Sequence, residues 1–192
     1  NPSQAEWKEI STHKEMTEVL NINKTSLNII TTNELLEIYL QYPLLLDIWA
    51  FNNLQTGFIS VKENFNGLQE LLQRKDLKDI AIEKYSKALL QKDTFDIHFT
   101  QLLLSQKEII SVLNIDDINN LSILTSEFVK QQINSKDYSL FSISVSTYLI
   151  SHLVNFGYNE KYMNKIGEEQ KEKVLYFFNN CNIPTVNIIN VI

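Results

Sequence analysis

Glycine and proline are scarce in this chain of 192 residues, which has only four glycines and three prolines. Neither residue occurs between Leu68 and Phe156. A β-rich domain of this length reverses direction many times, and tight reversals usually need the backbone angles that Gly and Pro supply. Long helices need few reversals, so this scarcity argues against a β-rich domain and predicts an all-α fold.

Cysteine and long apolar runs are also lacking. Cys181 is the single cysteine, so no intrachain disulfide can form, and a zinc site would need several more ligands. No apolar run reaches the roughly 18 residues typical of a membrane span. The chain begins at Asn1-Pro2, so we expect any signal peptide or lipid anchor to lie on a precursor. The sequence predicts no metal and no cofactor.

Positive charge is in deficit. The chain has 17 Lys and Arg against 23 Asp and Glu, a net charge of −6. An acidic chain gains no counterion release on DNA or RNA, which makes nucleic acid a poor partner. The lysines do not gather into a basic face for anionic lipid either. A hydrophobic content of 44% is ordinary for a globular protein.

The domain organisation predicted from the sequence is a single domain over residues 31–183, an irregular bundle of six to eight helices. Residues 1–30 are expected to form an N-terminal arm that is partly helical or mobile. Residues 184–192 are a short β-prone tail, which we expect to pack on the bundle or to form a strand-like flap.

Two signals mark the start of the core. Thr31 and Glu34 make a capping-box pattern, which predicts a helix beginning at Thr31. Pro43 suits a first helical turn but not a helix interior, so we expect a break near 41–42 and a new helix over 43–51. Because that segment is apolar nearly all round, it predicts a central, buried helix.

Apolar side chains spaced by three and four residues predict the helices that follow. We expect Asn52-Asn53 and Gly57 to end the preceding helix. The next stripe, over residues 58–72, contains Gly67, which marks close packing, a kink or a cost of about 1 kcal/mol. The further helices are expected over residues 76–91, 95–113, 116–134 and about 160–180, with a turn at 92–94.

Residues 138–156 admit two interpretations. Phe141-Ser-Ile-Ser-Val-Ser alternates as a strand does. The same segment carries an apolar helical stripe that runs longer and ends at Gly157, a natural C-cap. We therefore predict a helix and keep the strand as the alternative.

None of the three histidines, His13, His98 and His152, lies in a metal motif or at ligand spacing from Cys181. Asp96 and His98 are two positions apart and point in different directions on a helix, so we expect a surface or capping role for His98. His152 lies on an apolar stripe, where we expect a buried or half-buried imidazole bonded to a neighbouring helix. The functional alternative is a pocket residue that titrates near neutral pH.

Asp47 lies in the most apolar predicted helix, where an ionised carboxylate is costly unless it is paired. We expect it to anchor a nearby backbone end or to meet a Lys or Arg. The functional alternative is an acid in a cleft with Tyr39 and Trp49. Phosphate loops and catalytic serine or cysteine motifs are absent, so the catalytic residues stay unknown, with Asp47, His98 and His152 as the candidates.

The string Tyr42-Pro-Leu-Leu-Leu-Asp-Ile-Trp-Ala-Phe-Asn52, continued by Gln55-Thr-Gly-Phe58 and Asn64-Phe-Asn-Gly-Leu-Gln-Glu-Leu-Leu72, resembles an uncharacterised family of exported helical proteins from Bacteroides-type gut bacteria. The resemblance covers residues 34–74. It implies a helical fold and export to the cell envelope, but it implies no activity and no site residues.

Three functions are compatible with these observations. The first is an exported, non-catalytic binding or interaction module of the periplasm or cell envelope, with a protein partner. The second is a small enzyme whose cleft uses Asp47, His98 or His152. The third is a structural module tethered to the envelope through a removed N-terminal anchor. A cytoplasmic location stays open.

Overall fold

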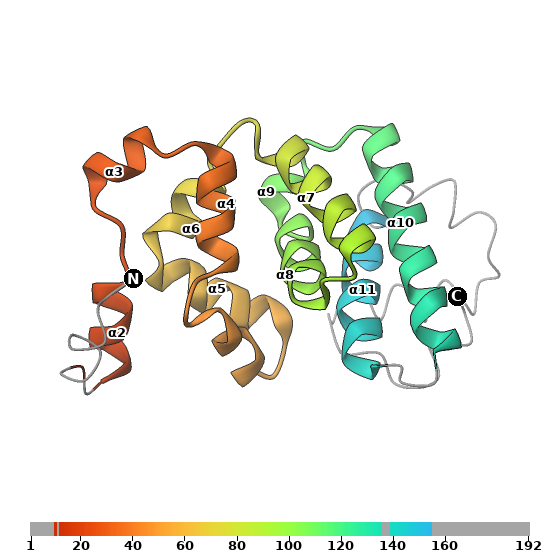
Figure 1. Cartoon of the computed structure of the whole chain (residues 1–192), viewed down its shortest axis with the longest axis horizontal. Coiled ribbons are helices and arrows are strands. Elements are labelled where there is room, and N and C mark those ends of the chain that lie inside the picture. Colours follow the sequence, from red (N-terminus) through yellow and green to blue (C-terminus); the bar gives the residue numbers. More distant parts are fainter. Residues whose placement is uncertain (1–9, 11, 136–138, 155–192) are drawn as a thin grey trace. The chain divides into compact units, whose positions relative to one another are not determined.

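Every regular element in the described part of the chain is helical, which confirms the predicted all-α class (Figure 1). The computed structural model describes residues 10, 12–135 and 139–154. The chain divides into two compact units, Asn1–Ile80 and Ala81–Ile192. Unit 1 holds α2 (His13–Val19), α3 (Lys24–Ile29), α4 (Thr32–Leu40), the 3₁₀ helix η1 (Leu45–Ala50), α5 (Leu54–Asn64) and α6 (Asn66–Leu71). The unit boundary falls inside α7 (Leu77–Gln91), and unit 2 continues with α8 (Thr94–Leu104), α9 (Lys107–Ile110), α10 (Ile115–Asn134) and α11 (Leu140–Leu153).

The helices of unit 1 begin where side chains can cap them. The predicted capping box at Thr31 is confirmed, since the Thr31 hydroxyl accepts from the backbone N–H of Glu34, and the Glu34 carboxylate accepts from the backbone N–H of Thr31. The Thr31 hydroxyl also donates to the Glu34 carboxylate, and this bond, together with the one from the Thr31 backbone N–H, lowers the pKa of Glu34. Thr12 and Glu15 make the same reciprocal box at the start of α2. Within the predicted arm, α2 and α3 are therefore locally encoded helices.

The segment after Pro43 differs from the prediction, because it forms η1 and not a central, buried α-helix. A 3₁₀ helix has three residues per turn, so positions three apart lie on one face. Leu45 and Ile48 are that face and are fully buried, whereas Leu46 is 57% exposed. Although its sequence is apolar, η1 therefore lies at the surface and buries only one narrow face.

Gly57 explains how η1 packs. Gly57 was expected to help end a helix, but it lies in the first turn of α5, after the N-cap Asn53. A Cβ atom on Gly57 would stand 2.1 Å from the carbonyl oxygen of Ile48, far inside van der Waals contact. Only glycine lets the backbone of η1 approach α5 this closely.

Gly67 marks close packing and a break. The stripe predicted over residues 58–72 is split at Phe65, whose extended backbone ends α5 and precedes α6. A Cβ atom on Gly67 would lie 2.3 Å from Cζ of the Phe65 ring. The Phe65 ring folds over Gly67 and stacks on Tyr42, with centroids 4.2 Å apart.

In the described residues of unit 2, which end at residue 154, helices turn and end without glycine or proline. The predicted turn at 92–94 is present, and Lys92 takes the left-handed conformation there, with φ 57°. The helix predicted over 95–113 is two helices, α8 and α9. The Ser105 hydroxyl donates to the carbonyl of Gln101, and the Gln106 amide donates to that of Leu102, so side chains satisfy the last carbonyls of α8.

The helix predicted over residues 138–156 is confirmed as α11, and the strand alternative is wrong. The predicted helices over 76–91 and 116–134 are confirmed as α7 and α10. Asn114, which lies between the two predicted helices 95–113 and 116–134, is the N-cap of α10 and shares a capping box with Asp117. The expected helix at about 160–180, the tail at 184–192 and Cys181 lie outside the described residues.

A buried polar ladder joins four helices of unit 2. The amide of Gln101 on α8 donates to the Tyr85 hydroxyl on α7 and to the Ser146 hydroxyl on α11, each at 2.9 Å. Tyr85 also bonds Thr125 on α10, at 3.1 Å. Buried polar groups are costly unless satisfied, so these bonds fix which faces of the helices meet. Burial raises the pKa of Tyr85, and the phenol stays protonated.

The close approach at Gly57 generates a prediction about stability. Gly57→Ala should lower the free energy of unfolding by about 1–3 kcal/mol, because the new methyl group overlaps the Ile48 carbonyl. Helix propensity alone predicts the opposite, a gain of about 1 kcal/mol. Urea denaturation followed by circular dichroism measures the sign. Thr56→Ala, at the exposed neighbouring position in the same turn, is the control and should change stability by only a few tenths of a kcal/mol.

Candidate functional site

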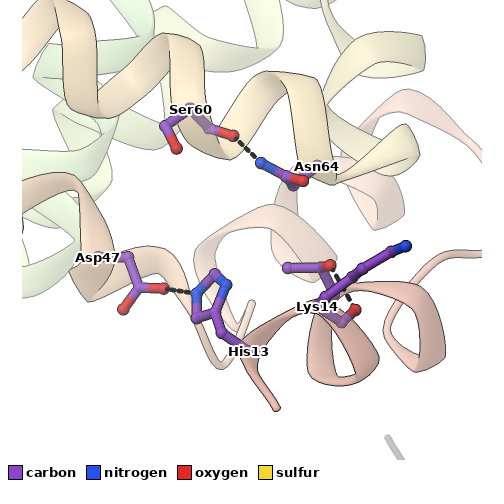
Figure 2. A network of polar contacts seen from close by, with 6 residues as sticks. His13, Lys14, Asp47, Ser60 and Asn64 are labelled. Carbon is purple, nitrogen blue, oxygen red and sulfur yellow. Dashed lines mark hydrogen bonds and ion pairs between the residues drawn. The ribbon is translucent and has the colours of Figure 1, made fainter.

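Asp47 lies at the edge of a pocket in unit 1, paired with His13. The pair joins Nε2 of His13 and Oδ2 of Asp47 at 2.7 Å, across 34 residues of sequence (Figure 2). An ionised carboxylate can only accept, so the imidazole donates from Nε2. Asp47 was expected to meet a backbone end or a Lys or Arg, and the partner observed is a histidine.

Local sequence sets the position of each member of the pair. His13 is the first residue of α2, directly after the N-cap Thr12, so the capping box of α2 fixes where the imidazole starts. Asp47 is in the first turn of η1, on the outward side of the buried Leu45–Ile48 face. Both side chains keep contact with solvent, with 64% of His13 and 39% of Asp47 exposed.

The pocket beside this pair has a volume of about 320 Å³. Its walls come from α2, η1, α5 and the segment before η1. The carbonyl of Ser60 accepts a hydrogen bond from the Asn64 side chain on the α5 wall, at 2.8 Å. Besides the pair, the lining residues are Thr17, Tyr42, Leu44, Ala50, Phe51, Ser60, Val61 and Asn64.

Tyr42 supplies a neutral phenol to the pocket. Burial, together with the negative charge of Asp47, raises the pKa of Tyr42 to about 12. The phenol therefore remains a hydrogen-bond donor over the physiological pH range. Tyr42 also lines a second pocket of about 460 Å³, with the connection between α2 and α3 and the end of α4. Tyr42 thus borders both pockets, and Phe65, on which it stacks, lines the second.

His98 is buried, which corrects the expected surface or capping role. Its Nε2 bonds the Ser142 hydroxyl on α11 at 2.9 Å, and the Phe141 ring meets it edge-on at 5.0 Å. Burial lowers the pKa of His98 to about 4, so the ring is neutral at pH 7. Asp96 forms an ion pair with Lys84 at 2.8 Å, and it does not share a site with His98, as its spacing predicted.

His152 lies on α11 and is half-buried, in agreement with the buried or half-buried imidazole expected from its apolar stripe. Its ring packs against Tyr148, with centroids 4.5 Å apart, and burial lowers its pKa. It lies ten positions after Ser142, the partner of His98, which is about 15 Å along a helix. The two histidines therefore do not meet in one site, and Asp47 has His13 as its partner.

The described part of the chain holds no group of three or more His, Cys, Asp or Glu side chains that could bind a metal ion. None of the described helices is long and apolar enough to cross a membrane. No family model matches the chain, and no curated protein or solved structure shows significant similarity to it. The resemblance to exported Bacteroides-type proteins stays a prediction.

The sequence did not predict that His13 pairs with Asp47 and lines the pocket. Its partner is 34 residues away, and α2 is too short to carry a strong apolar stripe. The only available signal was local: Thr12 and Glu15 make the same capping pattern as Thr31 and Glu34. That pattern predicts where α2 begins, and hence that His13 sits at a helix start, but it does not predict what the imidazole meets.

The buried state of His98 generates a pH prediction. Its pKa is about 4 in the folded protein, below the ordinary value of 6.5, so the unfolded chain binds the proton more readily. Stability should be unaffected by His98 above pH 6.5 and should fall by about 3 kcal/mol as pH drops toward 4. Urea denaturation of the wild type and His98→Gln at several pH values measures this contribution.

His98→Gln keeps a side chain that can hydrogen-bond Ser142 but does not titrate, so its stability should fall less steeply between pH 6.5 and 4. The carboxylates and His152 are common to both proteins and cancel in the comparison. Equal slopes for the two proteins would show that His98 is readily protonated in the fold.

Proposed function

We propose that this chain is a non-catalytic binding protein, whose pocket between α2, η1 and α5 takes a small amphipathic ligand. The observation that carries the proposal is the pocket of about 320 Å³ with the His13–Asp47 pair at its edge. That volume is at the lower end of the range typical of small-molecule sites, roughly 300–1,000 Å³. The proposed cellular setting is the bacterial envelope or periplasm.

The lining supports an amphipathic ligand. Leu44, Phe51 and Val61 offer apolar surface that would pack against a ring or an alkyl chain. At the polar edge, Nδ1 of His13 can form a hydrogen bond, and the protonated phenol of Tyr42 can donate one. A ligand with an apolar body and one hydroxyl or amide group fits this combination best.

Binding is favoured over catalysis by where the candidate residues lie. A cleft built from Asp47, His98 or His152 needs at least two of them together. His98 is buried against Ser142 and neutral, and His152 is about 15 Å further along α11. Asp47 meets His13, and the Thr17 hydroxyl, also in the pocket, is engaged in donating to the carbonyl of Lys14. These arrangements support a recognition site.

The binding proposal can be tested with a matched pair of pocket variants. Ser60→Phe places a large ring at the pocket wall on α5, whereas Ile59→Phe changes the adjacent, 41% exposed position, which does not line this pocket. Ligand-observed NMR would screen a library of small molecules that each carry one ring or chain and one hydroxyl or amide. We expect binders whose signal disappears with Ser60→Phe and persists with Ile59→Phe.

A library that yields no binder, or binders that are indifferent to Ser60→Phe, would contradict the proposal. Folding of both variants is checked by circular dichroism, because Ser60 is half-buried and the larger ring must remain at the rim.

The envelope location rests on the resemblance over residues 34–74 and is tested separately. We expect an antibody against the chain to detect the native protein in the periplasmic or envelope fraction of its source cells. Detection in the cytosolic fraction alone would contradict this part of the proposal and leave the pocket proposal standing.

A further inference from the structure

Helix α2 covers part of the proposed binding pocket and is lightly held. It contributes His13 and Thr17 to the pocket lining, and only Thr17 among its seven residues is buried. An isolated helix of this length is unstable in water, so contacts with the rest of unit 1 must keep it folded. Elements with few buried apolar contacts open locally at the lowest free energy. By these criteria α2 is among the elements of unit 1 that should open most readily.

The carboxyl end of α2 is fastened by a clamp of three hydrogen bonds at Asn66. The Asn66 side chain accepts from the backbone N–H of Ile22 at 2.9 Å and donates to the Ile22 carbonyl at 2.6 Å. The backbone N–H of Asn66 donates to the Asn21 side chain at 2.8 Å. Ile22 also packs toward Gly67, with its Cδ1 3.0 Å from where a Cβ atom would stand. None of these groups titrates near neutral pH.

The amino end of α2 is fastened by the His13–Asp47 pair. His13 and Asn21 are eight positions apart, about 12 Å along a helix. The two fastenings therefore lie at opposite ends of α2. The His13–Asp47 pair is solvent-exposed, so water competes for it, and exposed pairs contribute little to stability. The Asn66 clamp is partly buried and uses three bonds, so the His13 end should release first.

We infer that α2 is a lid, hinged at Asn21–Ile22 and latched by His13–Asp47, which controls entry to the pocket. This inference rests on the proposed function of that pocket. When the latch opens, α2 moves away about the Asn66 clamp and removes His13 and Thr17 from the wall. Away from the rest of unit 1 so short a helix unfolds, which exposes its backbone amides. The second pocket is lined by Val19 and the residues at the hinge itself, and it meets the first at Tyr42. Movement of α2 would therefore widen access on both sides of the Tyr42 ring.

Hydrogen–deuterium exchange of the full chain, read by mass spectrometry, tests the lid. The reporter amides are those of residues 16–20, because Met16 donates to Thr12 and Leu20 donates to Met16 only while α2 is folded. His13→Ala and Asp47→Ala each remove the latch and should speed exchange of these amides about two- to fivefold. Exchange in α4 should not change.

Lys14→Ala is the matched control. It breaks the Lys14–Glu18 pair, which is more exposed than the latch and lies entirely within α2. If Lys14→Ala speeds exchange as much as His13→Ala, or if His13→Ala and Asp47→Ala leave it unchanged, the latch is overturned. His13→Ala and Asp47→Ala change opposite sides of the latch. The same effect in both variants therefore cannot come from one substitution disturbing its own local structure.

Pocket access is measured with the dye 8-anilinonaphthalene-1-sulfonate, which fluoresces in apolar pockets. In stopped-flow mixing, His13→Ala should raise the association rate about two- to fivefold over wild type, and Lys14→Ala should not. Adding Ser60→Phe to the wild type or to His13→Ala should abolish the dye signal. A dye signal unaffected by Ser60→Phe would overturn the pocket and hence the proposed function, even if exchange in α2 changes.

Loss of the signal with Ser60→Phe, together with unchanged exchange and association in His13→Ala, would overturn the lid alone. The two failures are therefore distinguishable, because Ser60 lies on α5 and the latch joins α2 to η1.

Discussion

Unit 1 depends on one steric constraint, the approach of the Ile48 carbonyl to Gly57. Because a Cβ atom at Gly57 would lie 2.1 Å from that oxygen, η1 can rest on α5 only if this residue is glycine. The contact turns Leu45 and Ile48 inward and so directs Asp47, between them in sequence, toward the surface. Asp47 then meets His13, the first residue of α2, at the edge of the pocket. A local packing requirement in the first turn of α5 thus determines where the polar edge of the site lies.

Unit 2 uses its polar side chains differently. Gln101, Tyr85 and Ser146 satisfy one another out of contact with water, and His98 is held neutral against Ser142. In a low-dielectric interior such bonds are costly to break, so they specify one packing arrangement of α7, α8, α10 and α11. His98 bonds Ser142 and Gln101 bonds Ser146, so residue numbers increase in the same direction along α8 and α11. The two helices therefore run parallel at this contact. These groups organise the fold and are poorly placed to bind a ligand.

The sequence predicted best what is decided locally. The Thr31–Glu34 box and the helix over 76–91 depend on neighbours within a few residues, and both are present. The errors fall where distant residues decide. The 3₁₀ helix after Pro43 packs against Gly57, which lies on the next helix, and His98 is buried because α11 covers it. The predicted helix over 95–113 is split where the Ser105 and Gln106 side chains bond carbonyls at the end of α8. No glycine marks this helix end, so the sequence has no distinctive pattern there. His13–Asp47 spans 34 residues and had no local signal.

The contrast between the polar groups of the two units bears on function. A group that responds to a ligand has to exchange its hydrogen-bond partner at a small cost in free energy. A solvent-exposed ion pair can do so, whereas a buried hydrogen-bonded ladder cannot. Among the described histidines, His13 is the one that meets a carboxylate at a pocket edge, whereas His98 and His152 are set among apolar and aromatic side chains. His13, on a short capped helix near the start of the chain, therefore lies at the polar edge of the pocket for which we propose ligand recognition. In the proposed lid, α2 completes the wall of the pocket while the His13–Asp47 pair is closed and leaves the wall when the pair opens.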